Sequence, residues 1–459
     1  MAREVAAAET RRFGRSAAML SIGVGSAGLL TYVYFSLASH NLDRTSYGEV
    51  VVLWSAVFVT ISVLFRPVEQ LLSRTIAARQ ARGESIGEAL RVGATIQIGL
   101  AVAFAAAALA LRGPLEDDLL SGDSTLYWIL VGAVLAFGAS FFARGFLAGS
   151  RRFVLYGALL LAESTARMSF ALAVAVGIAH GQTAVALGIV AAPVLSLTVV
   201  PLAFAGRAVA KRSGVPPTPA KEGTQFTLAR GGGFAAAVLL IMVSEQSLLN
   251  AGPLIVRASD GAAAAGFIFN VLMIARAPLV LFQAVATSLL PHLTRLRSST
   301  ATGDAGAFRM SIRVTVAAIA GFAAAVGLVV AIAGPELMQL AFGEKFTYDR
   351  AGLLIVTAGM GFYLASGTLN QATLAQGQAR SAAARWVVCA GGFIVWNLIP
   401  VLDEFRRVEV GFAGAAALLC ALLYLLYRHP PEVPRPEDVV APGSPEEIEA
   451  RLAAADEAS

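Results

Sequence analysis

The stretch SAAMLSIGVGSAGLLTYVYFSLAS, residues 16–39, runs for 24 residues without a charged side chain. A helix of about 20 residues crosses the roughly 30 Å hydrocarbon core of a bilayer, so this stretch is long enough to span a membrane. Backbone groups in hydrocarbon must find their hydrogen-bond partners inside the segment, and the stretch lacks the alternating pattern of a barrel strand. Residues 16–39 therefore predict a transmembrane helix.

Working outward from this stretch, the rest of the chain repeats the pattern. The protein is 57% hydrophobic and 14% charged, with a mean hydropathy of +0.71, whereas soluble proteins carry about 25% charged residues. We therefore expect an all-α integral membrane protein of about twelve transmembrane helices. Eleven further apolar stretches fall at residues 50–72, 91–111, 125–148, 154–179, 183–206, 228–251, 263–290, 311–333, 351–376, 384–402 and 408–428.

The distribution of lysine and arginine predicts the orientation of these helices. With the N-terminus inside, 26 of the 35 basic residues flank the inner ends of the helices, 7 lie in outer loops and 2 lie within helices. Cytoplasmic loops of membrane proteins carry an excess of lysine and arginine. We expect a multi-pass protein of the bacterial inner (plasma) membrane, with both termini in the cytoplasm.

Composition also argues against two classes of function. The net charge is +5, but the basic residues flank apolar segments and form no single face, which speaks against nucleic-acid binding. The four histidines show no ligand spacing, and Cys389 and Cys420 lie inside apolar stretches, as small core residues do. We expect neither a metal site nor an organic cofactor, and no enzymatic activity.

The charged and proline-rich segments divide the chain into two halves. Residues 207–227 contain Pro216, Pro217 and Pro219 at the midpoint and predict a cytoplasmic linker. This linker separates an N-lobe over 16–206 from a C-lobe over 228–428, preceded by a cytoplasmic segment over 1–15. The acidic, proline-rich residues 429–459 predict a disordered cytoplasmic tail.

Weak internal similarity supports this division. Leu71-Leu72-Ser73-Arg74, at the end of the second stretch, is similar to Leu289-Leu290-Pro291-His292, at the end of the eighth. Both positions are equivalent if each lobe holds six helices in the same orientation. Ser46-Tyr47-Gly48, which opens the second stretch, is similar to Ala264-Ala265-Gly266, which opens the eighth. The two matches favour a parallel repeat, a common architecture among transporters.

Two charged sites lie inside the predicted N-lobe helices. A charge at a helix centre costs about 2.5–3.5 kcal/mol on insertion scales, so such residues mark structural or functional sites. Arg66 lies in the inner third of the second helix, where it either reaches the headgroups or contacts a substrate. Glu163 lies about 15 Å deep in the fifth helix, one turn before Arg167. This i,i+4 spacing predicts an ion pair, which serves either helix packing or the coupling of transport to a cation.

Two further charges lie in the C-lobe and lack partners within their own helices. Glu245 lies in the seventh helix beside Gln246 and Asn250, and Arg276 lies in the eighth. Each must therefore find a partner on another helix or in a water-filled cavity. We interpret Arg276, Arg66, Asn250 and Gln246 as substrate-binding candidates, and Glu245, Glu163 and Arg167 as coupling candidates.

Several short motifs point to a known family. They are Leu42 through Tyr47-Gly48-Glu49, Arg144-Gly145-Phe146-Leu147-Ala148-Gly149 through Arg152-Phe153, Arg276-Ala277-Pro278 through Leu289-Leu290-Pro291, and Leu340-Ala341-Phe342-Gly343. With them the chain resembles, over nearly all of 10–428, the polysaccharide transporter branch of the multidrug/oligosaccharidyl-lipid/polysaccharide exporter superfamily, which includes O-antigen and lipid II flippases.

The resemblance implies a fold, a function and partners. It implies two six-helix lobes that form a V around a cavity lined by helices one, two, seven and eight, which would place Arg66, Glu245 and Arg276 toward that cavity. It implies a flippase that translocates a polyprenyl-pyrophosphate oligosaccharide by alternating access for surface polysaccharide biosynthesis, coupled to H⁺ or Na⁺. The partners would be the lipid-linked glycan, membrane lipid and enzymes of glycan biosynthesis.

Three other functions remain open at this point. A cation-coupled multidrug exporter of the same superfamily usually carries an acidic residue in its first helix, and residues 16–39 contain none. A membrane glycan polymerase or transferase needs acids and bases in a large outer loop, whereas the loop over 112–124 offers only Glu116, Asp117 and Asp118. A scaffold that docks through its tail would need none of the charges in the helices.

Overall fold

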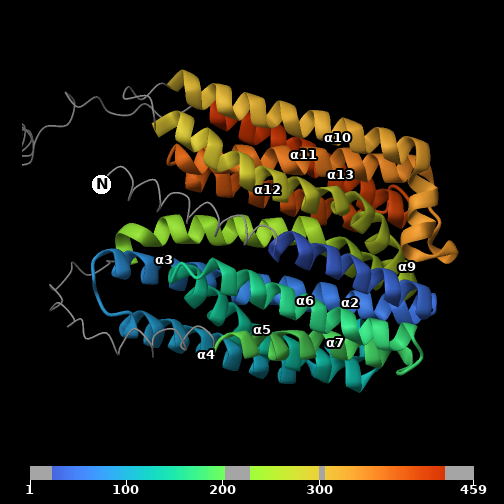
Figure 1. Ribbon diagram of the computed structural model, residues 1–459. Helices are drawn as coiled ribbons and strands as arrows, with labels where there is room; N and C mark the ends of the chain where they lie inside the picture. Colours follow the sequence, from blue (N-terminus) through green and yellow to red (C-terminus); the bar gives the residue numbers. More distant parts are fainter. Residues whose placement is uncertain (1–22, 202–227, 299–304, 430–459) are drawn as a thin grey trace, which may run out of the picture.

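The computed structural model describes residues 23–201, 228–298 and 305–429, and these residues form helices joined by short turns, without a β-strand (Figure 1). A helix over 23–41 comes first. The other helices are α2 (Arg44–Leu64), α3 (Arg66–Ala81), α4 (Gly87–Ala110), α5 (Ser124–Gly149), α6 (Phe153–Ala175), α7 (Gly181–Ser196), α9 (Leu228–Ser298), α10 (Ala305–Phe342), α11 (Arg350–Ala375), α12 (Ala379–Leu398) and α13 (Glu404–Arg428). The predicted segment 1–15, the linker over 207–227 and nearly all of the tail lie outside the described residues.

The expected set of about twelve spanning helices is confirmed. Ten segments of the described chain are long and apolar enough to cross a membrane. One of them, Ala236–Arg276, contains two helices, because Gly261 (φ 84°) interrupts α9 with a backbone conformation that only glycine adopts readily. The helix over 23–41 adds the first crossing. The second crossing is made of α2 and α3 together.

Four helices begin at the same end of the molecule with an aspartate cap. The caps of α2 and α5 are Asp43 and Asp123, and each accepts hydrogen bonds from two backbone N–H groups of the first turn. The caps of α11 and α13 are Asp349 and Asp403, and each accepts one. The hydrogen bonds from Ser46, followed by that from Thr45, hold the pKa of Asp43 below its usual value. We call this the outer end of the molecule, after the predicted topology, and the opposite end the inner end.

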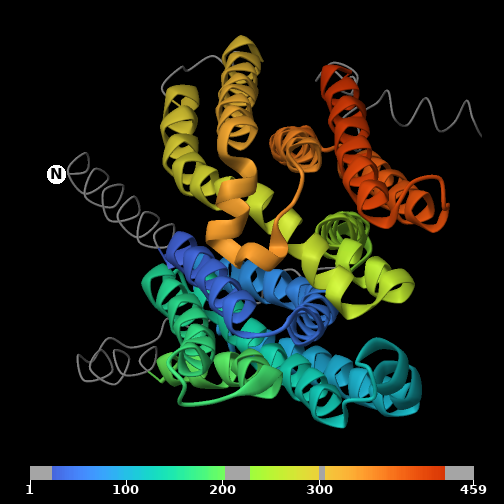
Figure 2. The same ribbon diagram turned by 90° about the vertical axis from the view of Figure 1, so that its right-hand side faces the viewer.

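The helices gather into the two expected lobes. Figure 2 shows the N-lobe, built from the helix over 23–41 and α2–α7, below the C-lobe, built from α9–α13. Helix α2 of the N-lobe packs extensively on α9 of the C-lobe, whereas α3 packs on α4 and α5 of its own lobe. At the outer end, Tyr47 donates a hydrogen bond to Asn270 and Lys345 donates one to the carbonyl of Leu42. The outer end is thus the place where the two lobes are held together.

Small residues allow the second crossing to pack closely on both lobes, with α2 against α9 and α3 against α5. A Cβ at Gly48 of α2 would overlap the carbonyl oxygen of Ala262, and one at Gly266 would lie 2.9 Å from the Cα of Gly48. Further along the same crossing, a Cβ at Gly145 of α5 would lie 2.9 Å from the carbonyl oxygen of Glu69 in α3. Such close backbone approach is typical of packed membrane helices. The outer half of this crossing is therefore attached to the C-lobe and the inner half to the N-lobe.

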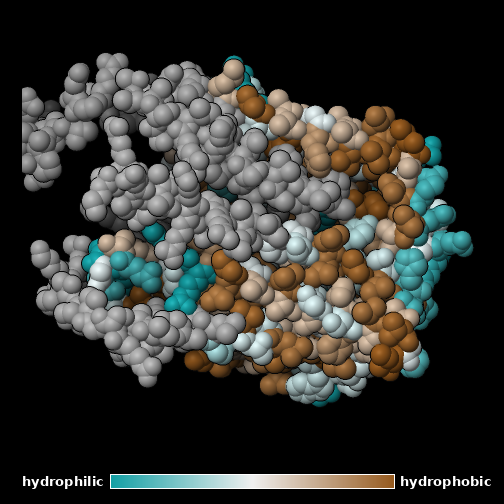
Figure 3. All heavy atoms as spheres, in the orientation of Figure 1, coloured by the Kyte–Doolittle hydropathy of each residue, from teal (hydrophilic) through white to brown (hydrophobic). Residues whose placement is uncertain are grey.

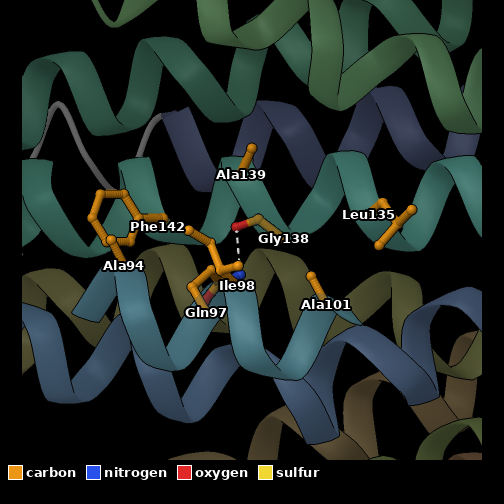
Figure 4. A pocket seen from close by; sticks show the side chains of 8 residues that line it. All are labelled: Ala94, Gln97, Ile98, Ala101, Leu135, Gly138, Ala139 and Phe142. Carbon is orange, nitrogen blue, oxygen red and sulfur yellow. Dashed lines mark hydrogen bonds between the residues drawn. The ribbon is translucent and has the colours of Figure 1, made fainter. Parts of the chain in front are cut away.

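The surface has the apolar belt of a membrane protein. In Figure 3 hydrophobic residues dominate the sides of the molecule, and hydrophilic residues gather at the outer end. A groove on the N-lobe lies between α4 and α5 (Figure 4), where Gln97 donates a hydrogen bond to the carbonyl of Gly138 at 2.8 Å. Its other lining side chains are apolar, so this groove is a lipid-facing feature and holds none of the candidate site residues.

Candidate functional site

The C-lobe candidates lie on the two halves of α9, which run in opposite directions from the bend at Gly261. Glu245 comes 16 residues before Gly261 and Arg276 comes 15 residues after it. At 1.5 Å per residue both lie about 23 Å from the bend, and therefore at the same depth. The bend thus brings together two charges that are far from each other along the chain.

Arg276 has one side-chain hydrogen-bond partner among the described residues, and that partner is neutral. Its Nη1 lies 3.5 Å from Oδ1 of Asn250, and Nδ2 of Asn250 donates to Oε1 of Gln246 at 2.9 Å. The buried Nε of Arg276 has no hydrogen-bond partner in the described part of the chain, and no carboxylate there forms an ion pair with this guanidinium. Asn250 and Gln246, both buried, hold the guanidinium in place, and among the described residues no carboxylate compensates its charge.

Glu245 is held by a residue that the sequence did not single out. The hydroxyl of Tyr363, on α11, donates to Oε1 of Glu245 at 3.1 Å. The Tyr363 ring is buried and packs against Trp386 and Phe412, with ring centroids 6.2 Å and 6.4 Å away. The pairing of Glu245 with Arg276 that the depth of both residues suggests is not present in this conformation. Glu245 and Arg276 instead take separate partners.

Arg66 brings the N-lobe into this arrangement. It is half-buried and begins α3, directly after the break between α2 and α3, where Pro67 cannot donate to the preceding turn. Tyr363 interacts electrostatically with Glu245, Arg276 and Arg66. The charges that act on this phenol thus come from both lobes, Glu245 and Arg276 from the C-lobe and Arg66 from the N-lobe. That Arg66, Glu245 and Arg276 point toward one cavity stays a prediction.

The N-lobe holds a second buried charge cluster. The predicted i,i+4 ion pair is present, with Nη2 of Arg167 lying 3.1 Å from Oε1 of Glu163. The other oxygen of Glu163 accepts from Arg144 on α5, a residue that the sequence did not single out as a site candidate. Arg167 also stacks over the Trp54 ring at 4.5 Å and donates to Thr31. One carboxylate clamped by two arginines ties four helices together.

Two polar clusters at the outer end were also missed. The fully buried Glu409 pairs with Arg406, which also reaches Asp349 at 2.7 Å. Gln182 donates to Glu49 at 2.6 Å and to Asp123 at 3.2 Å. The i,i+3 spacing of Arg406 and Glu409 is a local signal for the first cluster. No such signal exists for the second, because its residues come from three separate helix starts.

The acidic outer loop contains one ion pair and two exposed carboxylates. Within the π-helix Pro114–Leu119, Glu116 forms an ion pair with Arg112 at 2.7 Å, and Asp117 and Asp118 are exposed. Across the described residues no group of three His, Cys, Asp or Glu side chains is arranged to hold a metal ion.

Comparison of the sequence with known proteins finds relatives of similar length. No family profile matches the chain. The uncharacterized protein Rv3630 of Mycobacterium tuberculosis is 26% identical over 427 residues, covering 87% of this chain and 88% of the relative. The uncharacterized protein Rv1510 of the same organism is 24% identical over 427 residues, covering 90% and 92%. Both matches cover most of the length of this chain and of the relative.

Solved structures with the same fold are transporters. A mutant of the Vibrio cholerae MATE transporter VcmN matches with a TM-score of 0.56 and 15% identity, covering 91% of this chain and 97% of that one. The eukaryotic MATE transporter AtDTX14 matches with a TM-score of 0.58 and 14% identity, covering 90% and 94%. An inward-facing multidrug resistance MATE transporter of the MOP superfamily matches with a TM-score of 0.58 and 13% identity, covering 90% of this chain and 97% of that one. The expected fold, an all-α membrane protein of about twelve helices in two lobes, is thereby confirmed, and it matches the fold of MATE transporters.

Proposed function

We propose that this protein is an alternating-access transporter that flips a polyprenyl-pyrophosphate-linked oligosaccharide across the inner membrane for surface polysaccharide biosynthesis. The lipid part of this cargo stays in the bilayer, while the pyrophosphate and the sugars pass between the lobes. Moving the pyrophosphate through hydrocarbon without a counter-charge is prohibitive, so the path needs fixed cations. The MATE fold supports transport in general, and the charges between the lobes support an anionic cargo.

The observation that carries this proposal is that Arg276 has no carboxylate partner among the described residues. Arginines within membrane spans normally pair with a carboxylate or a carbonyl. Arg276 lies at the depth of Glu245 and yet has only the Asn250 amide as a partner among the described residues. Its planar guanidinium presents a fork of donors that suits phosphate oxygens. Arg66, closer to the inner end, supplies a second cation on the loading side.

Glu245 is our candidate for coupling to a proton or sodium gradient. Its carboxylate accepts from the neutral phenol of Tyr363 rather than from an arginine, so it is free to take up and release a cation as the lobes move. Glu163 is the weaker coupling candidate, since Arg144 and Arg167 clamp both of its oxygens. A carboxylate in that position has two permanent counter-charges and serves helix packing.

Reconstitution of the full-length protein tests this function. Liposomes would carry a polyprenyl-pyrophosphate oligosaccharide with a fluorescent sugar, and a membrane-impermeant reductant would report the fraction in the outer leaflet. We expect exchange between leaflets for the wild type, none for Arg276→Ala, and partial exchange for Arg276→Lys, which keeps the charge but not the fork. Arg385→Ala, in the same lobe, is the matched control and should retain exchange. Normal exchange by Arg276→Ala would overturn the proposal.

A cation-coupled multidrug exporter is the second candidate, and one observation favours it. The Glu245–Tyr363 contact gives the C-lobe an acidic site without a competing arginine contact, and such a site suits cationic drugs as well as a coupling ion. Uptake of ethidium into everted membrane vesicles, driven by a proton or sodium gradient, separates the two functions. Uptake that depends on Glu245 and not on Arg276 would favour the exporter over the flippase.

A further inference from the structure

Glu69 is a carboxylate that lies one turn from Arg66 and has no assigned role. Both residues belong to α3, at the i,i+3 spacing that allows an ion pair along a helix. In this structure no ion pair links them; among the described residues neither takes part in a salt bridge to the other. Something therefore keeps the carboxylate away from the nearest guanidinium on its own helix.

The backbone of Glu69 is fixed on the N-lobe. Gly145 of α5 crosses α3 at this residue, so closely that a Cβ on Gly145 would lie 2.9 Å from the carbonyl oxygen of Glu69 and 3.1 Å from its Cα. Four residues later in α5, a Cβ on Gly149 would meet Ile76 of α3 at 2.8 Å. The two glycines hold α3 against α5 over more than one turn. Glu69 thus has a defined position, and only its side chain can change direction.

Tyr156 sets that direction. Its hydroxyl, on α6, donates to Oε1 of Glu69 at 2.8 Å. The charges that face this carboxylate are Arg144 from α5 and Arg66 from α3, which attract it, and Glu163 from α6, which repels it. The hydrogen bond from Tyr156 and the attraction of Arg144 both act from the N-lobe side. Arg66 is the competing attraction, from the side where Tyr363 of the other lobe lies.

We propose that the Tyr156–Glu69 hydrogen bond is a positioning contact that holds the Glu69 carboxylate on the N-lobe side and so leaves Arg66 available to a phosphate or pyrophosphate. The proposal rests on the proposed function, in which Arg66 binds the anionic part of the cargo. Glu69 acts as an internal competitor of the cargo, and Tyr156 limits that competition. Once the cargo leaves, the same carboxylate is one turn away to neutralise Arg66.

This arrangement predicts that two substitutions change the affinity for pyrophosphate in opposite directions. Tyr156→Phe releases the carboxylate, which then pairs with Arg66 and competes with the anion. Glu69→Gln has nearly the same shape, still accepts the hydrogen bond from Tyr156, and removes the competitor. Binding of inorganic pyrophosphate should weaken about threefold to fivefold in the first variant and tighten by a similar factor in the second, the effect of one partly screened ion pair. A purely structural role would weaken binding in both.

The experiment is calorimetric titration of inorganic pyrophosphate into the purified full-length protein. Glu88→Gln is the matched control, because it makes the same charge change on the N-lobe at a residue that pairs with Arg79, and its affinity should equal that of the wild type. In an Arg66→Gln background, Glu69→Gln should give no tightening, since the competition acts through Arg66. Thermal unfolding of each variant establishes that it is folded.

The outcomes separate this inference from the proposed function. If the wild type binds pyrophosphate and Arg66→Gln weakens the binding, but both Tyr156→Phe and Glu69→Gln shift the affinity in the same direction, the positioning role is wrong and the anion site stands. Tightening by Glu69→Gln that persists without Arg66 also overturns the inference. If the wild type does not bind pyrophosphate, the anion site and the inference are both wrong.

Discussion

Glu163 and Arg167 lie one turn apart on α6, with the guanidinium 3.1 Å from the carboxylate and both side chains buried within the N-lobe. Arg144 occupies the remaining oxygen of the same carboxylate. A buried carboxylate with two guanidinium partners holds its neighbours in fixed positions, because removal of the shared charge would leave two buried cations without compensation.

Replacing Glu163 should therefore destabilise the protein. We expect Glu163→Gln to lower the free energy of unfolding by about 3 kcal/mol, the usual effect of breaking a buried ion pair. Thermal unfolding of the purified protein measures this change. Glu88→Gln, which breaks an ion pair whose carboxylate is 68% exposed, should cost less than about 1 kcal/mol. A Glu163→Gln variant with normal stability and uncoupled transport would instead make Glu163 a coupling residue.

The hydroxyl of Tyr363 should contribute more to transport than its aromatic ring does. Tyr363→Phe keeps the packing against Trp386 and Phe412 but leaves Glu245 without its hydrogen bond. We expect normal expression and thermal stability and a loss of roughly tenfold in gradient-driven transport, the effect of about one hydrogen bond to a charged group. Tyr424→Phe, an exposed tyrosine on α13, is the control. Equal rates for both variants would remove Glu245 from the coupling mechanism.

A side chain at position 48 should hold the lobes apart at the outer end. Gly48→Val places methyl groups where the backbone of Ala262 lies, so α2 and α9 cannot approach as they do here. In a background with Cys389 and Cys420 replaced, a cysteine at Ala263 should react faster with a membrane-impermeant maleimide. Gly99→Val, on α4 where nothing lies within 4 Å of a Cβ, should leave the reaction unchanged. Slow labelling in both variants would mean that the contact is not needed for closure.

The charge distribution predicts that both termini are cytoplasmic. Reporter fusions at three positions of the described outer loops should report the outside, and fusions at three positions toward the inner end should report the inside. The outer positions are Ser121, Gly181 and Asp260. The inner positions are Gly83, Ser213 and Ser299, the last two of which lie outside the described residues. Alkaline phosphatase activity measures the first group and green fluorescence the second, and a swapped result at any two positions would contradict the topology.

The acidic tail should be dispensable for transport. Its composition predicts disorder, and it follows Arg428, the last residue of α13. Truncation after Arg428 should leave membrane insertion and surface glycan unchanged, as measured by membrane fractionation and glycan staining. Loss of glycan at a normal protein level would show that residues 429–459 bind a required partner.

The sequence predicted the parts of this structure that depend on local pattern. Spanning helices follow from long apolar stretches, and the Glu163–Arg167 pair follows from its i,i+4 spacing. The second crossing extends to Ala81, beyond the predicted end at residue 72, because α3 is amphipathic and continues past the apolar stretch. Arg144 lies inside the predicted fourth stretch, which matches α5 to within one residue at its end, but the sequence did not indicate that its side chain is buried against Glu163.

Long-range contacts could not be predicted in the same way. Tyr363 and Glu245 are 118 residues apart and Tyr156 and Glu69 are 87 apart, and no spacing rule connects residues on helices that meet only in the folded protein. The separation of Glu245 from Arg276 likewise depends on Asn250 and Tyr363, two neutral residues that satisfy the charges independently. Sequence reasoning identified the charged candidates together with Gln246 and Asn250, and it missed Tyr363, which donates the hydrogen bond to Glu245.

The close approach of Gly48 to Gly266 also has a consequence for the folding and assembly of the two halves. Because α2 buries its surface against α9, the boundary between packing units does not coincide with the midpoint of the chain. The first six helices, synthesised alone, would present the α2 face of Tyr47 and Gly48 to lipid with its intended neighbour missing. The second six would likewise lack cover for Asn270 and Gly266. We therefore expect neither half to be stable alone, and native assembly to require the eighth helix, which carries Gly266 and Asn270.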